Sequence, residues 1–346
     1  MNKRIEWIDA AKGIGICLVV AGHALPANAT AATVIWAFHM PLFFFLSGLT
    51  AKAWRPGFLP SAWRGLHSLV VPYLVFSALS IVFWTASKGT IASGAAWHTA
   101  LSEMVYGVAG PEDGMPYNVP LWFFTCLFCV RLLFYVITAA FNTKALQIAA
   151  ASLLALIACL YVFPRFYSVA WNLDLAPIAL IFFLGGYYLK AGASASRTAS
   201  AGARAFIGLA ALVTFILCVA LNGRIDMNGR ILGNPVLFYL GAFAGIVMMV
   251  GTARRYASIR LLGTLGQASI VIFPIHFLFG LLPYRLFPSF TWYAYRITHS
   301  DMLAALLTAI VEIALCLPIY AAVLRWMPYL LGQVKRQVRP AAGNAP

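Results

Sequence analysis

The sequence predicts an all-α polytopic membrane protein with about ten transmembrane helices, and three observations lead to this class. The chain has 346 residues, of which 62% are hydrophobic and 10% charged, whereas soluble domains carry about 25% charged residues. Apolar runs of about 20 residues, long enough to cross a bilayer, recur along the chain. The 24 Lys and Arg residues separate these runs and form no basic stripe with interleaved aromatic residues. A soluble protein and a nucleic-acid-binding protein are therefore both excluded.

Apolar runs bounded by proline, glycine and charged residues define the expected spans. They are residues 7–26, 32–51, 67–87, 119–140, 145–163, 173–190, 205–222, 234–252, 264–283 and 302–325. The stretch 88–119 lacks a strong apolar run and is rich in glycine, so we expect a loop that can hold a short helix. Residues 1–330 are then a single transmembrane domain, and residues 331–346 are a short cytoplasmic tail.

The distribution of positive charge predicts the orientation of the chain. With the N-terminus in the cytoplasm, about 15 Lys and Arg residues fall in inner segments and about 6 in outer ones. The positive-inside rule then places both termini in the cytoplasm. The sequence shows no internal repeat and no paired broken spans, which are typical of secondary transporters.

The first span carries charge into the membrane. Its purely apolar part, residues 13–26, is too short to cross a bilayer, so the helix must extend back to include Asp9 and Lys12. The alternative is a signal peptide cleaved after the small-residue sequence at 27–29, although acidic residues are unusual before the apolar core of such a peptide.

Helical geometry places the polar residues of this span on one face. Lys12 and His23 are 11 positions apart, which separates them by about 20° around the helix and about 16 Å along it. Asp9 is one turn from Lys12 and can pair with it. Ionisable residues at membrane depth are functional candidates by default. The alternative interpretation is a Lys12 side chain that snorkels to the interface and a His23 close to a loop.

A second histidine lies inside the second span. His39 is some eight residues, or about 12 Å, from the outer end of that span. A buried imidazole needs a polar partner, and two histidines on neighbouring helices can mark one cavity. The alternative is a structural histidine bonded to a carbonyl group or a serine.

All six cysteines lie inside apolar runs, so neither a disulfide framework nor a zinc site is expected. Cys126 and Cys129 have the spacing of a metal-binding pair, but one pair without nearby histidines indicates packing. No bound metal is therefore predicted.

Three stretches carry a recognisable pattern of motifs: residues 7–23 with Asp9, Lys12-Gly13 and Gly22-His23, residues 38–48 from Phe38-His39-Met40-Pro41 to Ser47-Gly48, and residues 265–276 from Leu265-Gly266-Gln267 to His276. Together they resemble the acyltransferase-3 family of membrane O-acyltransferases, in particular its fucose-4-O-acetylase-like branch. The chain departs from the wider family at Lys12, where Arg is usual, and at His67, where a second Arg is expected after Arg64. Unlike the larger members of that family, it is expected to act through the membrane domain alone, without an appended extracytoplasmic domain.

The resemblance implies a multi-pass O-acetyltransferase of the cell inner (plasma) membrane. The donor would be cytoplasmic acetyl-CoA, and the acceptor a sugar hydroxyl of a surface or exported polysaccharide or of its lipid-linked oligosaccharide precursor. A thioester is already activated, so no permanently bound cofactor, metal or ATP is expected. The partners are then acetyl-CoA, the glycan acceptor and the lipid bilayer, with no nucleic acid.

The same resemblance suggests roles for individual residues. His23 suits the general base, with Lys12 and Asp9 as further catalytic residues near the donor. The acceptor or the oxyanion would be bound by His39, His276, Ser47 and Trp122. The CoA phosphates would be bound by Arg55, Arg64, Arg254, Arg255 and Arg260, although positive-inside topology alone would also place these arginines on the inner side.

Two other classes compete with an enzyme. In a secondary transporter, Asp9, Lys12, His23 and His39 would line a substrate or proton path. A scaffold would leave the charges buried in the first span unexplained.

Overall fold

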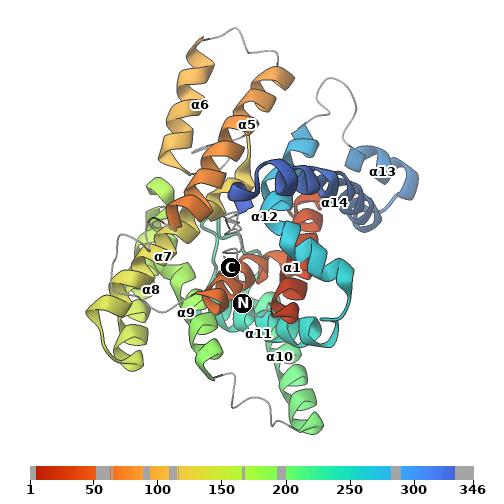
Figure 1. Ribbon diagram of the computed structural model, residues 1–346. Helices are drawn as coiled ribbons and strands as arrows, with labels where there is room; N and C mark the ends of the chain where they lie inside the picture. The colour runs from red at the N-terminus through yellow and green to blue at the C-terminus, as the bar shows by residue number, and fades with distance from the viewer. Residues whose placement is uncertain are drawn as a thin grey trace, which may run out of the picture.

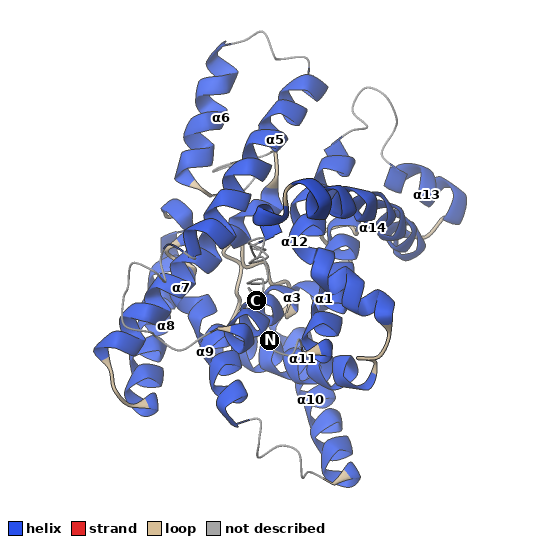
Figure 2. Cartoon of the chain, viewed as in Figure 1, coloured by secondary structure: helices blue, strands red, loops and turns tan. Residues whose placement is uncertain are grey.

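The computed structural model describes residues 5–51, 63, 65–88, 94–108, 115, 117–165, 168–192, 200–281 and 290–331. Within these ranges the secondary structure is helical, apart from one isolated bridge between Asp226 and Ile231 (Figures 1 and 2). The helices are α1 (Glu6–Ala24), α2 (Thr30–Trp36), α3 (His39–Thr50), η1 (Leu66–Val70), α5 (Val71–Lys88), α6 (Gly94–Tyr106), η2 (Val119–Leu121), α7 (Trp122–Ala140), α8 (Lys144–Arg165), η3 (Ala170–Asn172), α9 (Ala176–Gly192), α10 (Ala201–Asn222), α11 (Pro235–Arg255), α12 (Arg260–Leu281), α13 (Phe290–Thr298), α14 (Asp301–Trp326) and η6 (Pro328–Leu331).

Among the residues that the structure describes, ten segments are long and apolar enough to cross a membrane, and each coincides within a few residues with a span expected from the sequence. The prediction of an all-α polytopic membrane protein is therefore confirmed. Large apolar side chains are exposed along α8, α10 and α14, as a lipid-facing surface requires. In α10, only Ala211, Phe215 and Cys218 are buried, so this helix touches the bundle along one stripe.

Helix α1 lies at the centre of the bundle and packs against α12, α14, α11 and α3. Two glycines let the backbones of α1 and α12 approach closely. A methyl group on Gly13 would lie 2.1 Å from the carbonyl oxygen of Leu262, and one on Gly266 would lie 1.9 Å from that of Asp9. Small residues permit this kind of helix contact in membrane proteins. The bundle is thus built around the first span, which supports its retention over removal as a signal peptide.

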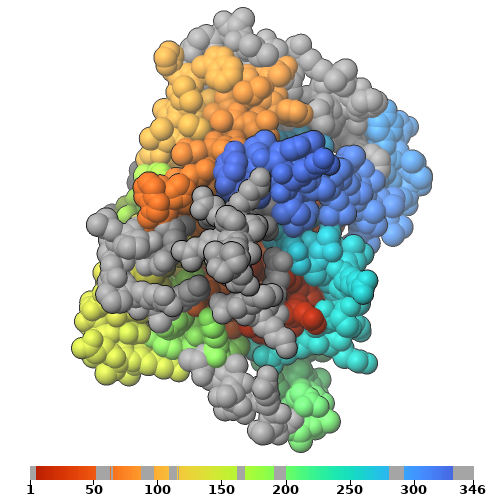
Figure 3. Space-filling model, viewed as in Figure 1, coloured from red at the N-terminus to blue at the C-terminus, as the bar shows by residue number. Residues whose placement is uncertain are grey.

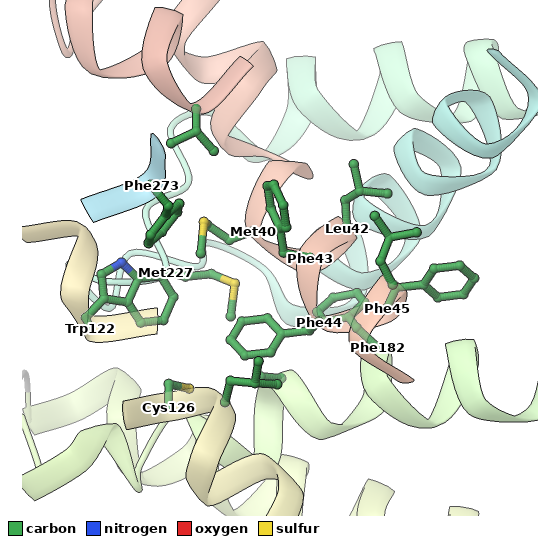
Figure 4. Close-up of a cluster of buried hydrophobic side chains, with 14 of the residues drawn as sticks. Met40, Leu42, Phe43, Phe44, Phe45, Trp122, Cys126, Phe182, Met227 and Phe273 are labelled. Atoms are coloured by element: carbon green, nitrogen blue, oxygen red, sulfur yellow. The ribbon is translucent and has the colours of Figure 1, made fainter. Parts of the chain in front are cut away.

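Helices α3 and α9 make a second contact of the same kind. A methyl group on Gly48 would lie 1.9 Å from the carbonyl oxygen of Phe183, and one on Gly186 would lie 2.0 Å from that of Phe45. The buried side chains from Leu42 to Phe45 fill the space beside this contact (Figure 4). Two glycine-paired contacts therefore hold α1 close to α12 and α3 close to α9.

The second expected span, residues 32–51, is present as the candidate span Thr30–Thr50, but its helix is broken. The span is interrupted after Trp36 by a two-residue turn, and α3 begins at His39. The reason is local, because Pro41 has no N–H to donate to the carbonyl group of Ala37 and its ring would crowd that group. The imidazole of His39 instead bonds the carbonyl oxygen of Ile35 at 3.0 Å. The histidine therefore lies at a helix start inside the protein.

The loop expected between the third and fourth spans holds a helix, α6, which pairs with the end of α5 in a hairpin. This hairpin forms a lobe at one end of the molecule, and α10 projects at the opposite end (Figure 3). The short helix α13 before α14 has no counterpart in the sequence-based expectation. The predicted tail from residue 332 onward lies outside the described residues.

Candidate functional site

A cavity of about 210 Å³ brings together residues from all three motif-bearing stretches. It lies at the C-terminal end of α1 and the starts of α3 and α7. Its polar lining residues are His23, His39, Asp226 and Asn228, and its aromatic ones are Trp36, Trp122, Phe273 and Phe277. The sequence stretches that were singled out separately therefore form one site.

His23 lies in the last turn of α1, and its exposed surface faces this cavity. The centroid of its ring is 5.3 Å from that of His276 and 6.0 Å from that of Phe277. A hydroxyl group held in the cavity can therefore approach an imidazole nitrogen of His23.

The other two histidines have fixed rings. Nδ1 of His39 lies 3.0 Å from the carbonyl oxygen of Ile35, and Nδ1 of His276 lies 2.9 Å from that of Ile272. A carbonyl oxygen only accepts, so Nδ1 carries the hydrogen and Nε2 of each neutral ring keeps its lone pair. In His276 this Nε2 is buried without a hydrogen-bond partner among the described residues. It is thus a proton acceptor beside His23.

Aromatic side chains close the cavity on the protein side. Trp122 begins α7 and faces Met40, Met227 and Phe273 (Figure 4). Its ring also stacks obliquely on Phe44, with centroids 6.2 Å apart. Indole nitrogen donates only, and Figure 4 shows it on the edge of the ring nearest Phe273. The wall therefore combines flat apolar faces with a hydrogen-bond donor.

Another part of the cavity wall comes from the connection between α10 and α11, residues 223–234, which the sequence interpretation did not include. It supplies Asp226, Met227 and Asn228 to the cavity. A buried ion pair holds it in place, in which Nε of Arg230 lies 3.0 Å from Oδ2 of Asp174. In the sequence these two residues are 56 positions apart and appear only as charges of outer loops, so no local signal marks them as partners.

Asn118 is a second residue that sequence reasoning missed. Its amide donates to the hydroxyl of Ser80 at 2.8 Å and to the carbonyl oxygen of Pro274 at 2.9 Å. It is fully buried. Because Pro274 lies inside α12 just before His276, this amide fixes the part of α12 that carries the histidine.

Four of the predicted catalytic and acceptor-binding residues do not line the cavity: Asp9, Lys12, Ser47 and His276, the last of which packs beside His23. Lys12 and Asp9 are half-buried on α1, and because that helix is continuous Lys12 remains about 16 Å along it from His23. Ser47 is half-buried near the other end of α3 and does not line the cavity. Their predicted roles stay predictions.

Three of the five predicted phosphate-binding arginines lie together where α11 ends and α12 begins. Arg254, Arg255 and Arg260 are exposed there. The guanidinium of Arg254 lies 4.9 Å from the centre of the Trp7 ring at the start of α1. Arg55 and Arg64 lie outside the described residues. The arginine cluster and the cavity are thus at opposite ends of α1.

A family model described as an acyltransferase domain matches residues 5–321 of the chain. No curated protein and no solved structure matches it significantly.

Proposed function

The chain belongs to the acyltransferase-3 family and is a membrane acyltransferase, and from this premise we propose that it moves an acetyl group from cytoplasmic acetyl-CoA to a sugar hydroxyl. The acceptor is a surface or exported polysaccharide, or its lipid-linked precursor, as in the fucose-4-O-acetylase-like branch. The observation that carries the proposal is the cavity, where His23 and His39 face an aromatic wall. Such a site suits a hydroxylated ring beside a base.

The reaction needs one proton to move out and back. The acceptor oxygen attacks the thioester carbonyl carbon while a nitrogen of His23 takes the hydroxyl proton. The tetrahedral intermediate carries its charge on the former carbonyl oxygen, for which the indole N–H of Trp122 is an available donor. Collapse breaks the carbon–sulfur bond, and the departing CoA thiolate takes the proton back from His23. The products are an ester and free CoA.

Nε2 of His276 has a supporting role in this proposal. It is an acceptor 5.3 Å, between ring centroids, from the base. When His23 gains a proton, a small rotation of the His23 ring lets Nε2 of His276 accept a hydrogen bond from it. His39 has the same tautomer on the cavity wall and is suited to orient the acceptor hydroxyl.

The donor enters from the other end of α1. Trp7, on which Arg254 stacks, is 16 residues before His23, or about 24 Å along the helix. CoA is polyanionic, so its phosphates suit the exposed arginines. Its arm would then extend along α1 past Lys12 to reach the cavity. This arrangement requires both termini and the arginine cluster to be cytoplasmic, as the charge distribution predicts.

The strongest rival, a transporter, receives no support from the match to an acyltransferase domain. The half-buried Asp9 and Lys12 are equally compatible with a path for the acyl arm. A transporter would move solute unchanged, whereas the proposed enzyme makes an alkali-labile ester.

Transfer should depend on the side from which acetyl-CoA is supplied. The test uses sealed vesicles of known orientation containing the protein, radiolabelled acetyl-CoA, and cell-surface polysaccharide freed of its esters by mild alkali. Label should enter the polysaccharide as alkali-labile ester only when the donor is on the cytoplasmic face and the acceptor on the other. Transfer with the donor on the outer face alone would refute the proposed path, and absence of transfer in every arrangement would refute the proposed reaction.

The arginine cluster should affect donor affinity more than turnover. Replacing Arg254 and Arg255 together by Gln removes charge-assisted hydrogen bonds to phosphates that are remote from the reacting carbon, and such bonds contribute uniform binding. We expect the KM for acetyl-CoA to rise at least about tenfold with kcat within about twofold. The matched control replaces Arg204 and Arg325, which are also exposed at helix ends. If the KM for acetyl-CoA is the same in both double variants, the arginines do not bind the donor, and their position reflects only the positive-inside rule.

A further inference from the structure

The α10–α11 loop, residues 223–234, is held in one conformation by hydrogen bonds within it and at its base. Asp226 and Ile231 exchange two backbone hydrogen bonds of 2.7 and 2.8 Å. One oxygen of the Asp226 carboxylate also accepts from the backbone N–H of Gly229 at 2.9 Å, which closes the turn between them. At the base of the loop, the Asn222 amide donates to the carbonyl oxygen of Leu232 at 3.0 Å. The loop is therefore a preformed hairpin.

Buried contacts of Arg230 fix this hairpin to the bundle. Its guanidinium makes two bonds to the carboxylate of Asp174, at 3.0 and 3.2 Å, and a third to the side-chain oxygen of Asn172 at 3.0 Å. Asn172 in turn donates to the carbonyl oxygen of Gly107 at 3.1 Å. Arg230 itself has a backbone φ of 58°, an unfavourable value for a residue with a side chain. The surrounding bonds must offset this strain.

Such an anchor is a weak source of stability. Desolvating two charges costs several kcal/mol, and an apolar pair of the same shape is often as stable. What the ion pair does supply is one defined position, because a bidentate guanidinium fork fixes both distance and angle. The ion pair therefore fixes the position of the hairpin relative to the other residues of the cavity.

The position so fixed is at the cavity that holds the base. The tip of the hairpin supplies Asp226, Met227 and Asn228 to the cavity that His23 and His39 also line. Arg224 lies 3.5 Å from the Asp226 carboxylate and 5.4 Å, through its guanidinium, from the centre of the Trp36 ring. A carboxylate has about four lone-pair positions, so these contacts leave Asp226 able to accept from further donors. The cavity that holds the base thus also has a hydrogen-bond acceptor, and flat apolar rings line it.

We propose that the α10–α11 loop is the acceptor-recognition element, in which Asp226 and Asn228 bind hydroxyl groups of the sugar ring next to the hydroxyl that is acylated. A carboxylate and an amide can bind hydroxyls on neighbouring carbons, while the indole of Trp122 or Trp36 covers the apolar face of the ring. The loop then sets which hydroxyl is presented to His23. This inference rests on the proposed acetyl transfer to a sugar.

The substitution Asp226→Asn separates recognition from folding. Asn keeps the oxygen that accepts from Gly229, so the turn remains, but it replaces the other carboxylate oxygen by an amide that only donates. With alkali-treated cell-surface polysaccharide as acceptor, we expect the acceptor KM to rise at least about tenfold, since bonds to charged groups are the strong ones. The KM for acetyl-CoA should change less than about twofold.

The control is Asp301→Asn, which changes an exposed acidic residue in the first turn of α14 and should leave both KM values unchanged. Asn228→Ala is the second variant and should also raise the acceptor KM, with an unchanged thermal transition of the purified protein as evidence of folding. If the wild type transfers acetyl and both loop variants keep its acceptor KM, the inference is wrong and the proposed function stands. If the wild type transfers none, the proposed function fails, and the inference with it.

Discussion

The substitution His23→Ala is expected to lower kcat by at least about 10², because a single positioned base contributes 10² to 10⁴ to proton transfer. The ring surface of His23 faces the cavity, so its removal takes away the nitrogen that receives the hydroxyl proton. The protein should still insert and fold, because His23 borders the cavity and truncation of its side chain enlarges that cavity without opening a new void in the packed core. The measurement is the initial rate of ester formation from radiolabelled acetyl-CoA at saturating donor and acceptor.

Two further variants make this result specific. His98→Ala removes an exposed histidine of α6 and should leave kcat unchanged. His39→Ala should raise the acceptor KM more than it lowers kcat, because its proposed role is to orient the hydroxyl. The reverse pattern, with near-normal turnover in His23→Ala and a 10²-fold loss in His39→Ala, would transfer the base role to His39.

The substitution Gly266→Ala is expected to lower the free energy of unfolding by about 2 kcal/mol or more. Its methyl group would lie 1.9 Å from the carbonyl oxygen of Asp9, and overpacking in a core typically costs 1–3 kcal/mol. The obstacle is backbone, so it cannot turn aside as a side chain can. Helices α1 and α12 would have to separate, and with them His23 and His276. Thermal unfolding in detergent should therefore begin at a lower temperature, and kcat should fall as well.

Helix α12 provides its own control at Gly263, three residues earlier. A methyl group there meets no atom within 4 Å, and alanine has the higher helix propensity by about 1 kcal/mol. Gly263→Ala should therefore be neutral or slightly stabilising. Equal stability of the two variants would show that the close approach of α1 and α12 is not needed.

The two predictions are connected through α1. This helix carries the arginine-facing Trp7 at one end and His23 at the other, and its middle is fixed by the glycine contact with α12. A shift of α1 along α12 by one turn would move the base by about 5.4 Å relative to His276. The glycine pair therefore sets the geometry of the base as well as the stability of the bundle.

Much of the fold can be predicted from the sequence, because each membrane-spanning segment must meet the requirements of the bilayer within its own residues. A backbone in hydrocarbon must satisfy its own hydrogen bonds, so each apolar run of sufficient length becomes a helix regardless of its neighbours. Ten such runs were predicted, and the described part of the chain contains ten helical segments of this kind. The break before His39 was not predicted, although Pro41 is a local signal that could have indicated it.

The candidate site is predictable only in part. Helical periodicity put Lys12 and His23 on one face of the first span, the position of His39 inside the second span made it a further candidate, and the family motifs added His276. Periodicity within a helix cannot say which other segments complete a cavity. Ser47 belongs to the same motif as His39 but lies near the other end of α3, away from the cavity.

The sequence by itself determined the class of the protein, its spans and its family, and it identified His23, His39 and His276 as candidate site residues. Each of these conclusions depends on residues close together in the chain. Only the tertiary structure decided that His23 and His39 line one cavity together with Asp226 and Asn228, and that His276 packs beside His23. The buried pair of Arg230 and Asp174 that places this loop joins two segments 56 residues apart. Such a contact depends on how the helices between them pack, and packing is a property of the whole bundle that no local pattern of residues encodes.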